Sequence, residues 1–118
     1  MVSSIKSEID KLAEGLTKYP HVTILSDEIY SRQIFDKKEM PTFFNYPKLQ
    51  DRLIVLDGWS KAYAMTGWRM GWSVWPENLV PHVNKLLINS VSCVNAPSQF
   101  AGIAALDGPD DSINFMME

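Results

Sequence analysis

The chain has 118 residues, of which 46% are hydrophobic and 21% charged, and this balance predicts one globular domain over residues 1–118. Its net charge of −3 argues against nucleic acid or an anionic membrane as partner, and no apolar run is long enough for a transmembrane helix. A single cysteine excludes an internal disulfide framework, and the start of the chain has no apolar signal segment, so we expect a cytoplasmic protein.

The first half of the chain predicts a helix, a strand and a long connection. Apolar residues recur at helical spacing near the start: Ile5, Ile9, Leu12 and Leu16. Ser3 or Ser4 can cap this helix, and Pro20 ends it. Residues 22–25 predict a buried strand that ends before Asp27, and the polar segment 31–50 predicts a loop with a short turn of helix.

The second half predicts two strands and three helices. The strands lie at 53–56 and 70–75, and the helices at 77–90, 96–106 and from 111 onward. Pro81 is compatible with a position in the first turn of its helix, and Asn95 is a suitable N-cap for the next.

This order of elements predicts an α/β fold. The strands at 22–25 and 53–56 are joined by more than twenty residues, which is long enough for a crossover, so we expect them to be parallel. Asp27 and Lys61 then lie beyond the carboxyl ends of neighbouring strands, where open α/β sheets bind ligands. Arg69 reaches the same edge only if the third strand runs antiparallel to the second. We therefore predict parallel strands plus one antiparallel strand, flanked by helices.

The segment 58–71, Gly-Trp-Ser-Lys-Ala-Tyr-Ala-Met-Thr-Gly-Trp-Arg-Met-Gly, carries the most chemical information. The amine of Lys61 can form an imine with an aldehyde. The guanidinium of Arg69 matches the oxygens of a phosphate group. An aldehyde that carries a phosphate is what pyridoxal 5'-phosphate (PLP) presents, so the pair indicates this cofactor.

These residues also carry a family resemblance. Residues 26–30, Ser-Asp-Glu-Ile-Tyr, together with Ser60-Lys61 and residues 64–71, resemble the class I/II aminotransferases of the PLP-dependent fold type I group, in the aspartate/aromatic aminotransferase-like branch. The resemblance runs from the first helix to Gly108. It implies a central-to-C-terminal piece of the large PLP-binding domain, and transfer of an amino group between an amino acid and a 2-oxo acid by a homodimer.

The resemblance also implies a role for four residues. Lys61 is the catalytic Schiff-base lysine, and Asp27 pairs with the pyridine nitrogen of the cofactor. Tyr30 bonds the phenolic oxygen, and Arg69 grips the phosphate. Gly58 stands where many relatives have a phosphate-binding serine.

Several alternatives to an active aminotransferase stay open. A PLP-dependent lyase or synthase of the same fold, such as a relative of aminocyclopropane-carboxylate synthase, is the other chemistry, and a non-catalytic oligomeric fragment is the alternative outside enzymes. A truncated domain predicts exposed apolar faces, self-association, and weak or absent activity of the chain alone. We expect no metal site, because His21, His82 and Cys93 lack ligand spacing, and we expect Glu28 to be a solvated carboxylate.

Overall fold

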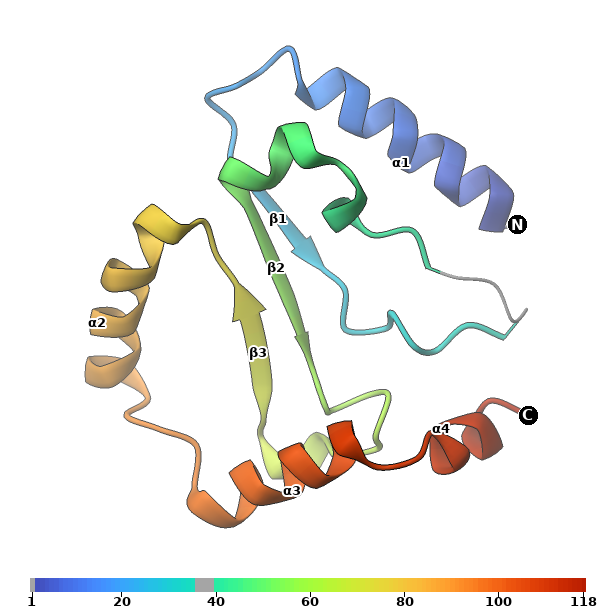
Figure 1. Ribbon diagram of the computed structural model, residues 1–118, viewed down its shortest axis with the longest axis vertical. Helices are drawn as coiled ribbons and strands as arrows, with labels where there is room; N and C mark the ends of the chain where they lie inside the picture. Colours follow the sequence, from blue (N-terminus) through green and yellow to red (C-terminus); the bar gives the residue numbers. More distant parts are fainter. Residues whose placement is uncertain (1, 36–39) are drawn as a thin grey trace.

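A three-stranded sheet forms the centre of the computed structural model, which describes residues 2–35 and 40–118. The strands are β1 (Ile24–Asp27), β2 (Leu53–Gly58) and β3 (Gly71–Val74), and they lie in that order. β1 and β2 are parallel, whereas β3 runs antiparallel to β2 (Figure 1). The predicted α/β fold and the predicted antiparallel strand are therefore confirmed.

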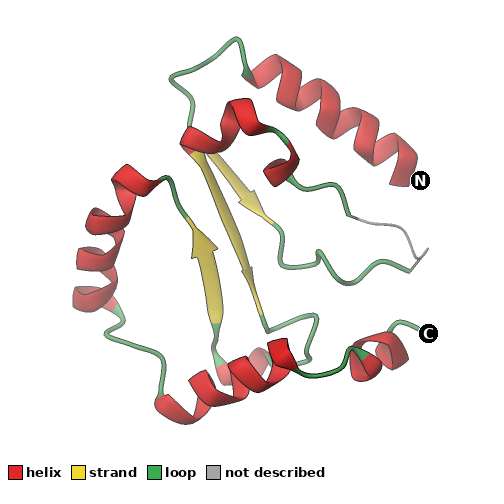
Figure 2. Cartoon of the chain, viewed as in Figure 1, coloured by secondary structure: helices red, strands yellow, loops and turns green. Residues whose placement is uncertain are grey.

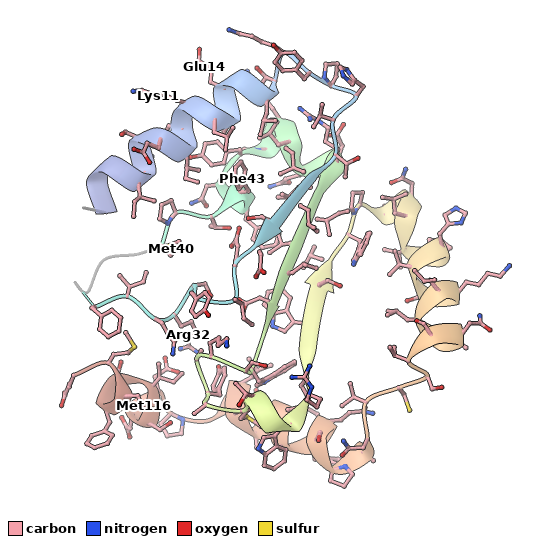
Figure 3. The ribbon with its side chains drawn as sticks, turned by 180° about the vertical axis from the view of Figure 1, so that it is seen from behind. Lys11, Glu14, Arg32, Met40, Phe43 and Met116 are labelled. Atoms are coloured by element: carbon pink, nitrogen blue, oxygen red, sulfur yellow. The ribbon has the colours of Figure 1, made fainter. Side chains whose placement is uncertain are left out.

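One face of β1 and β2 is covered by α1 (Val2–Leu16) and by two short 3₁₀ helices, η1 (Phe43–Asn45) and η2 (Pro47–Arg52). Buried residues from these elements form the main core: Ala13, Ile24, Phe43, Leu49, Leu53 and Val55. In Figure 3, Phe43 lies between α1 and the sheet, whereas Lys11 and Glu14 point away from the core. The core therefore holds the starts of β1 and β2 side by side.

Two local expectations about this half of the chain need correction. α1 begins at Val2, so Ser3 and Ser4 occupy positions in its first turn instead of the position before the helix. The predicted loop at 31–50, of which residues 36–39 lie outside the described residues, contains η1 and the first part of η2, which together exceed the single helical turn that we expected. At the other end of α1, the Arg52 guanidinium donates to the Leu16 carbonyl oxygen at 2.8 Å, and this bond satisfies an orphan acceptor of the helix.

The second half of the chain is mostly helical (Figure 2). Its elements are η3 (Thr66–Trp68), η4 (Glu77–Leu79), α2 (Val80–Ser90), α3 (Ala96–Asp107) and α4 (Asp111–Met116). Asn95 caps α3 as predicted, because its side chain accepts from the Ser98 N–H at 3.0 Å. None of the helices built from described residues is both long and apolar enough to cross a membrane.

The described chain is flat and open. Its extents are 44 × 41 × 19 Å and its radius of gyration is 16.3 Å, against about 13.5 Å for a compact domain of this length. α2 has no buried residue and packs closely only against η4. In Figure 1 it stands apart from the sheet, beyond β3. Large apolar side chains are consequently exposed on α2 and α3, among them Leu86, Ile88, Phe100 and Ile103.

Candidate functional site

The strand ends bring the predicted site residues to one edge of the sheet. Asp27 is the last residue of β1 and aligns with Leu56 of β2. β1 begins and ends two residues later than predicted, so Asp27 ends the strand instead of following it. Its Oδ1 accepts from the Ile29 N–H at 3.2 Å, which turns the chain toward Tyr30.

Lys61 and Tyr30 come from different loops and meet at this edge. Lys61 lies in the turn after β2 and is half-buried. Its Nζ lies 5.7 Å from the centroid of the Tyr30 ring, which is within the range of a cation–π contact. Tyr30 follows β1 and is 56% exposed, so its side chain is open to the surroundings of the edge.

Arg69 lies next to the start of β3, at the same edge. Gly71 of β3 aligns with Gly58, the last residue of β2, so the chain leaves and re-enters the sheet at one end. Arg69 has φ 56° and ψ 46°, a left-handed conformation that is uncommon outside glycine. Its Nη1 donates to the Thr66 carbonyl oxygen at 3.1 Å.

The four predicted residues are not all in mutual contact. Lys61 and Tyr30 touch, whereas Asp27 and Arg69 are linked to them through the alignment of the strands. Arg69 also lines a surface hollow of about 680 Å³ whose other lining residues come from the segments 64–68 and 91–98. That lining does not include Asp27, Tyr30 or Lys61, so the hollow lies beside the edge that these three residues share.

Residues that the sequence interpretation passed over hold this edge together. Ser31 Oγ donates to Asp57 Oδ2 at 3.0 Å, and Gln33 Nε2 donates to the Lys61 carbonyl oxygen at 3.2 Å. Ser31 directly follows Tyr30 and Gln33 comes three residues after it, so their place near a candidate site residue was the one signal available. The contacts join the loop after β1 to the end of β2 and to the turn that carries Lys61.

Glu28 is also different from our expectation. It is half-buried, and its Oε1 accepts from Ser26 Oγ at 3.0 Å and from the Phe43 N–H at 3.2 Å. It is therefore a structural acceptor that fixes η1 to the end of β1, and not a solvated carboxylate.

Trp59 and Gly58 explain how the turn carrying Lys61 is seated. Trp59 Nε1 donates to the Gly102 carbonyl oxygen of α3 at 3.0 Å. A Cβ on Gly102 would lie 3.2 Å from the Trp59 ring, so the glycine lets α3 approach the indole. A Cβ on Gly58 would lie 2.9 Å from both Gly71 Cα and the Met70 carbonyl oxygen. The glycine at the position where a serine was considered is therefore required by the close approach of β3.

The chemistry of these donors fits PLP. An amine, a carboxylate, a phenol and a guanidinium lie at one sheet edge, and they match the aldehyde, the pyridine nitrogen, the phenolic oxygen and the phosphate of that cofactor. No cluster of three or more potential metal ligands occurs among the residues that the structure describes.

The fold and this edge define a chain of the PLP-dependent aminotransferase type, and the chain belongs to the family "Aminotransferase class I and II", whose model matches residues 5–118. A probable aspartate/prephenate aminotransferase from Rickettsia felis is 39% identical over 107 residues, which are 90% of this chain and 26% of that protein. An aspartate aminotransferase from Rhizobium meliloti is 40% identical over 101 residues, 85% of this chain and 25% of that protein.

The solved structures agree with the sequence relatives. The crystal structure of the aspartate aminotransferase from Rhizobium meliloti matches with a TM-score of 0.90 at 34% identity, covering 95% of this chain and 28% of that one. An aromatic aminotransferase from Pyrococcus horikoshii shares the fold, with a TM-score of 0.87 at 24% identity over 95% of this chain and 30% of that one. The chain thus spans about a quarter of the length of the curated relatives that it matches.

Proposed function

We propose that this chain holds PLP at the carboxyl edge of its sheet and belongs to an enzyme that moves an amino group between an amino acid and a 2-oxo acid. The contact between Lys61 and Tyr30 is the observation that carries the proposal. These residues follow neighbouring parallel strands, and the amine lies 5.7 Å from the ring centroid. The edge that they share is the one at which open α/β sheets bind ligands.

Four residues of the chain divide the work at the proposed site. PLP, when bound, supplies an electron sink for the bonds of the substrate α-carbon. Lys61 Nζ would hold the cofactor through its aldehyde carbon, and the free amine would move a proton to and from the substrate α-carbon. Asp27 would keep the pyridine nitrogen protonated, and the Tyr30 hydroxyl would donate to the phenolic oxygen. The Arg69 fork binds the phosphate.

The substrates follow from the relatives. The relatives reported above are described as aspartate, aspartate/prephenate or aromatic aminotransferases, so we propose transamination, with aspartate as an amino donor, in preference to a lyase or synthase reaction. The matched segments make up only 26% and 25% of the two curated relatives. We therefore expect weak or no turnover by the 118 residues alone, and we propose that a homodimer is the active form.

Covalent labelling tests the role of Lys61. One equivalent of PLP is added to the chain, the amine replaces the aldehyde oxygen with release of water, and borohydride reduces the resulting C=N bond to a stable amine. We expect peptide mass spectrometry to find the label on Lys61, and Lys61→Ala to lose it. Lys85→Ala, a change at an exposed lysine of α2, is the matched control and should keep the label.

The distribution of the label decides between the alternatives. A label spread over surface lysines, unchanged in Lys61→Ala, would contradict the proposed site and favour a non-catalytic fragment. Rapid turnover of aspartate with a 2-oxo acid by the 118 residues would contradict the expectation of weak activity, while leaving the role of Lys61 in place.

A further inference from the structure

Arg32 joins three segments of the chain beside the proposed site. Its Nη1 donates to the Tyr63 hydroxyl at 2.5 Å, and its guanidinium carbon lies 5.5 Å from the centroid of the same ring. Its Nη2 forms an ion pair with Asp110 Oδ2 at 2.6 Å, at the start of α4. Figure 3 shows Arg32 on the loop after β1, close to the segment that connects β2 and β3.

The two partners of this contact stand at the same sequence spacing from two candidate site residues. Arg32 follows Tyr30 by two residues, and Tyr63 follows Lys61 by two residues. The contact between Tyr30 and Lys61 themselves is the cation–π contact, and such a contact contributes little where, as here, the ring is 56% exposed. Their separation is therefore determined by how the two loops are held together.

We propose that Arg32 is a positioning residue: by binding Tyr63 and Asp110 at once, it sets the separation of Tyr30 and Lys61. The inference rests on the proposed function, because it gives Arg32 a purpose only if those two residues share a ligand. A planar guanidinium suits the task, since its fork holds two partners in a fixed direction, whereas an ammonium acts as a point charge.

A role in positioning explains the contact better than a role in overall stability. The side chains of Arg32 and Asp110 are 39% and 53% exposed, and ion pairs with this exposure contribute little to the free energy of folding. Reactions at such sites, in contrast, are sensitive to geometry. A displacement of about 1 Å in a positioned group can cost about 100-fold in rate.

The first measurement needs no cofactor. Nuclear Overhauser effects between the Tyr30 ring and the Lys61 ε-methylene protons are recorded in the ligand-free chain, in Arg32→Gln and in Lys85→Gln. The control removes a positive charge from exposed α2. We expect the effect to persist in the parent chain and in the control, and to be lost in Arg32→Gln.

The second measurement uses PLP as a spectroscopic probe. The apparent pKa of the Lys61 adduct is read from its absorption between pH 5 and pH 10. We expect Arg32→Gln to shift it by about half a unit or more, because a displaced Tyr30 hydroxyl no longer stabilises the same protonation state. Arg32→Lys keeps the positive charge but lacks the planar fork of the guanidinium. It should therefore bring the adduct pKa only part of the way back to that of the parent chain.

The outcomes separate this inference from the proposed function. If Arg32→Gln does not fold, Tyr63→Phe removes the hydroxyl but keeps the ring, and it should weaken the same Overhauser effect. If either variant, Arg32→Gln or Tyr63→Phe, keeps both the Overhauser effect and the adduct pKa of the parent chain, the proposed role of Arg32 is overturned. If PLP never labels Lys61 in the parent chain, the proposed function fails, and the ligand-free comparison still decides whether Arg32 positions Tyr30 and Lys61.

Discussion

At the scale of single residues, close approach of the backbone explains the glycine at the end of β2. Gly58 aligns with Gly71 of β3, and a Cβ on Gly58 would meet backbone atoms at 2.9 Å. Backbone atoms cannot rotate away as the end of a flexible side chain can. The residue before the turn that carries Lys61 therefore has no room for a side chain, and under the proposed function the phosphate of the cofactor would be bound by groups other than a side chain at this position.

Gly58→Ser tests this requirement. We expect it to lower the free energy of unfolding by about 1–3 kcal/mol, since overpacking forces strands apart. Gly15→Ala is the matched control, because a Cβ there meets nothing within 4 Å and alanine favours a helix. Urea unfolding of both variants measures the difference. A midpoint for Gly58→Ser equal to that of the unchanged chain would show that β3 can move aside without cost.

At the scale of elements, one hydrogen-bond network docks α1 onto η2. Asp10 accepts from Tyr46 Oη at 2.6 Å, and Lys6 Nζ forms an ion pair with the same carboxylate at 2.8 Å. The bonds from Lys6 and Tyr46 lower the pKa of Asp10 from its ordinary value of 3.8. The bond to Asp10 raises the pKa of Tyr46 from 10.0 to about 12. The seating of α1 therefore depends on pH.

The sign of this dependence differs at the two ends of the pH scale. Tyr46 holds its proton more tightly in the folded chain. Its contribution to the free energy of unfolding is therefore complete below pH 10 and is lost as the pH rises toward 12. The contribution of Asp10 is present above pH 3.8 and is lost as the pH falls through its lowered pKa. In Tyr46→Phe, the stability of the folded chain should no longer fall above pH 10 for this reason. Melting temperatures recorded from pH 7 to pH 11.5 for both proteins measure the difference. Parallel curves for the two proteins would contradict the docking role of this bond.

At the scale of the whole molecule, exposed apolar helices predict association. Phe100, Ile103 and Leu106 of α3 are 74%, 56% and 56% exposed. The apolar residues of α3 are distributed around the helix and do not form a single stripe, which is typical of a helix that is buried on all sides. A patch of this kind marks a contact surface for other protein. The chain alone therefore has to cover α3 with another copy or leave it in water.

We expect the chain to self-associate at micromolar concentration through this helix. The double variant Phe100→Ser/Leu106→Ser should weaken association by at least about tenfold, because it removes apolar area that the contact buries. Tyr19→Ser, which changes an exposed aromatic residue in the turn after α1, should leave association unchanged. Sedimentation equilibrium gives the three dissociation constants. Equal values for all three proteins would place the contact elsewhere.

The amino-acid sequence alone determined the type of each main element, the antiparallel direction of β3 and the family to which the chain belongs. Helical periodicity, strand-like apolar runs and the segment around Lys61 and Arg69 are local signals, and each depends on residues that lie close together in the chain. The edge shared by Asp27 and Lys61 could also be predicted, because parallel strands place their carboxyl ends together.

Only the tertiary structure decided how that edge is held. The bond from Gln33 to Lys61 spans 28 residues, and the one from Arg32 to Tyr63 spans 31. Such pairs have no periodicity to read, because the packing of separate loops brings them together. The same reason explains why Glu28 was misjudged and why Gly58 was counted as a departure instead of a requirement. Local spacing predicts the chemistry proposed for this chain, and long-range packing arranges the residues that would carry it out.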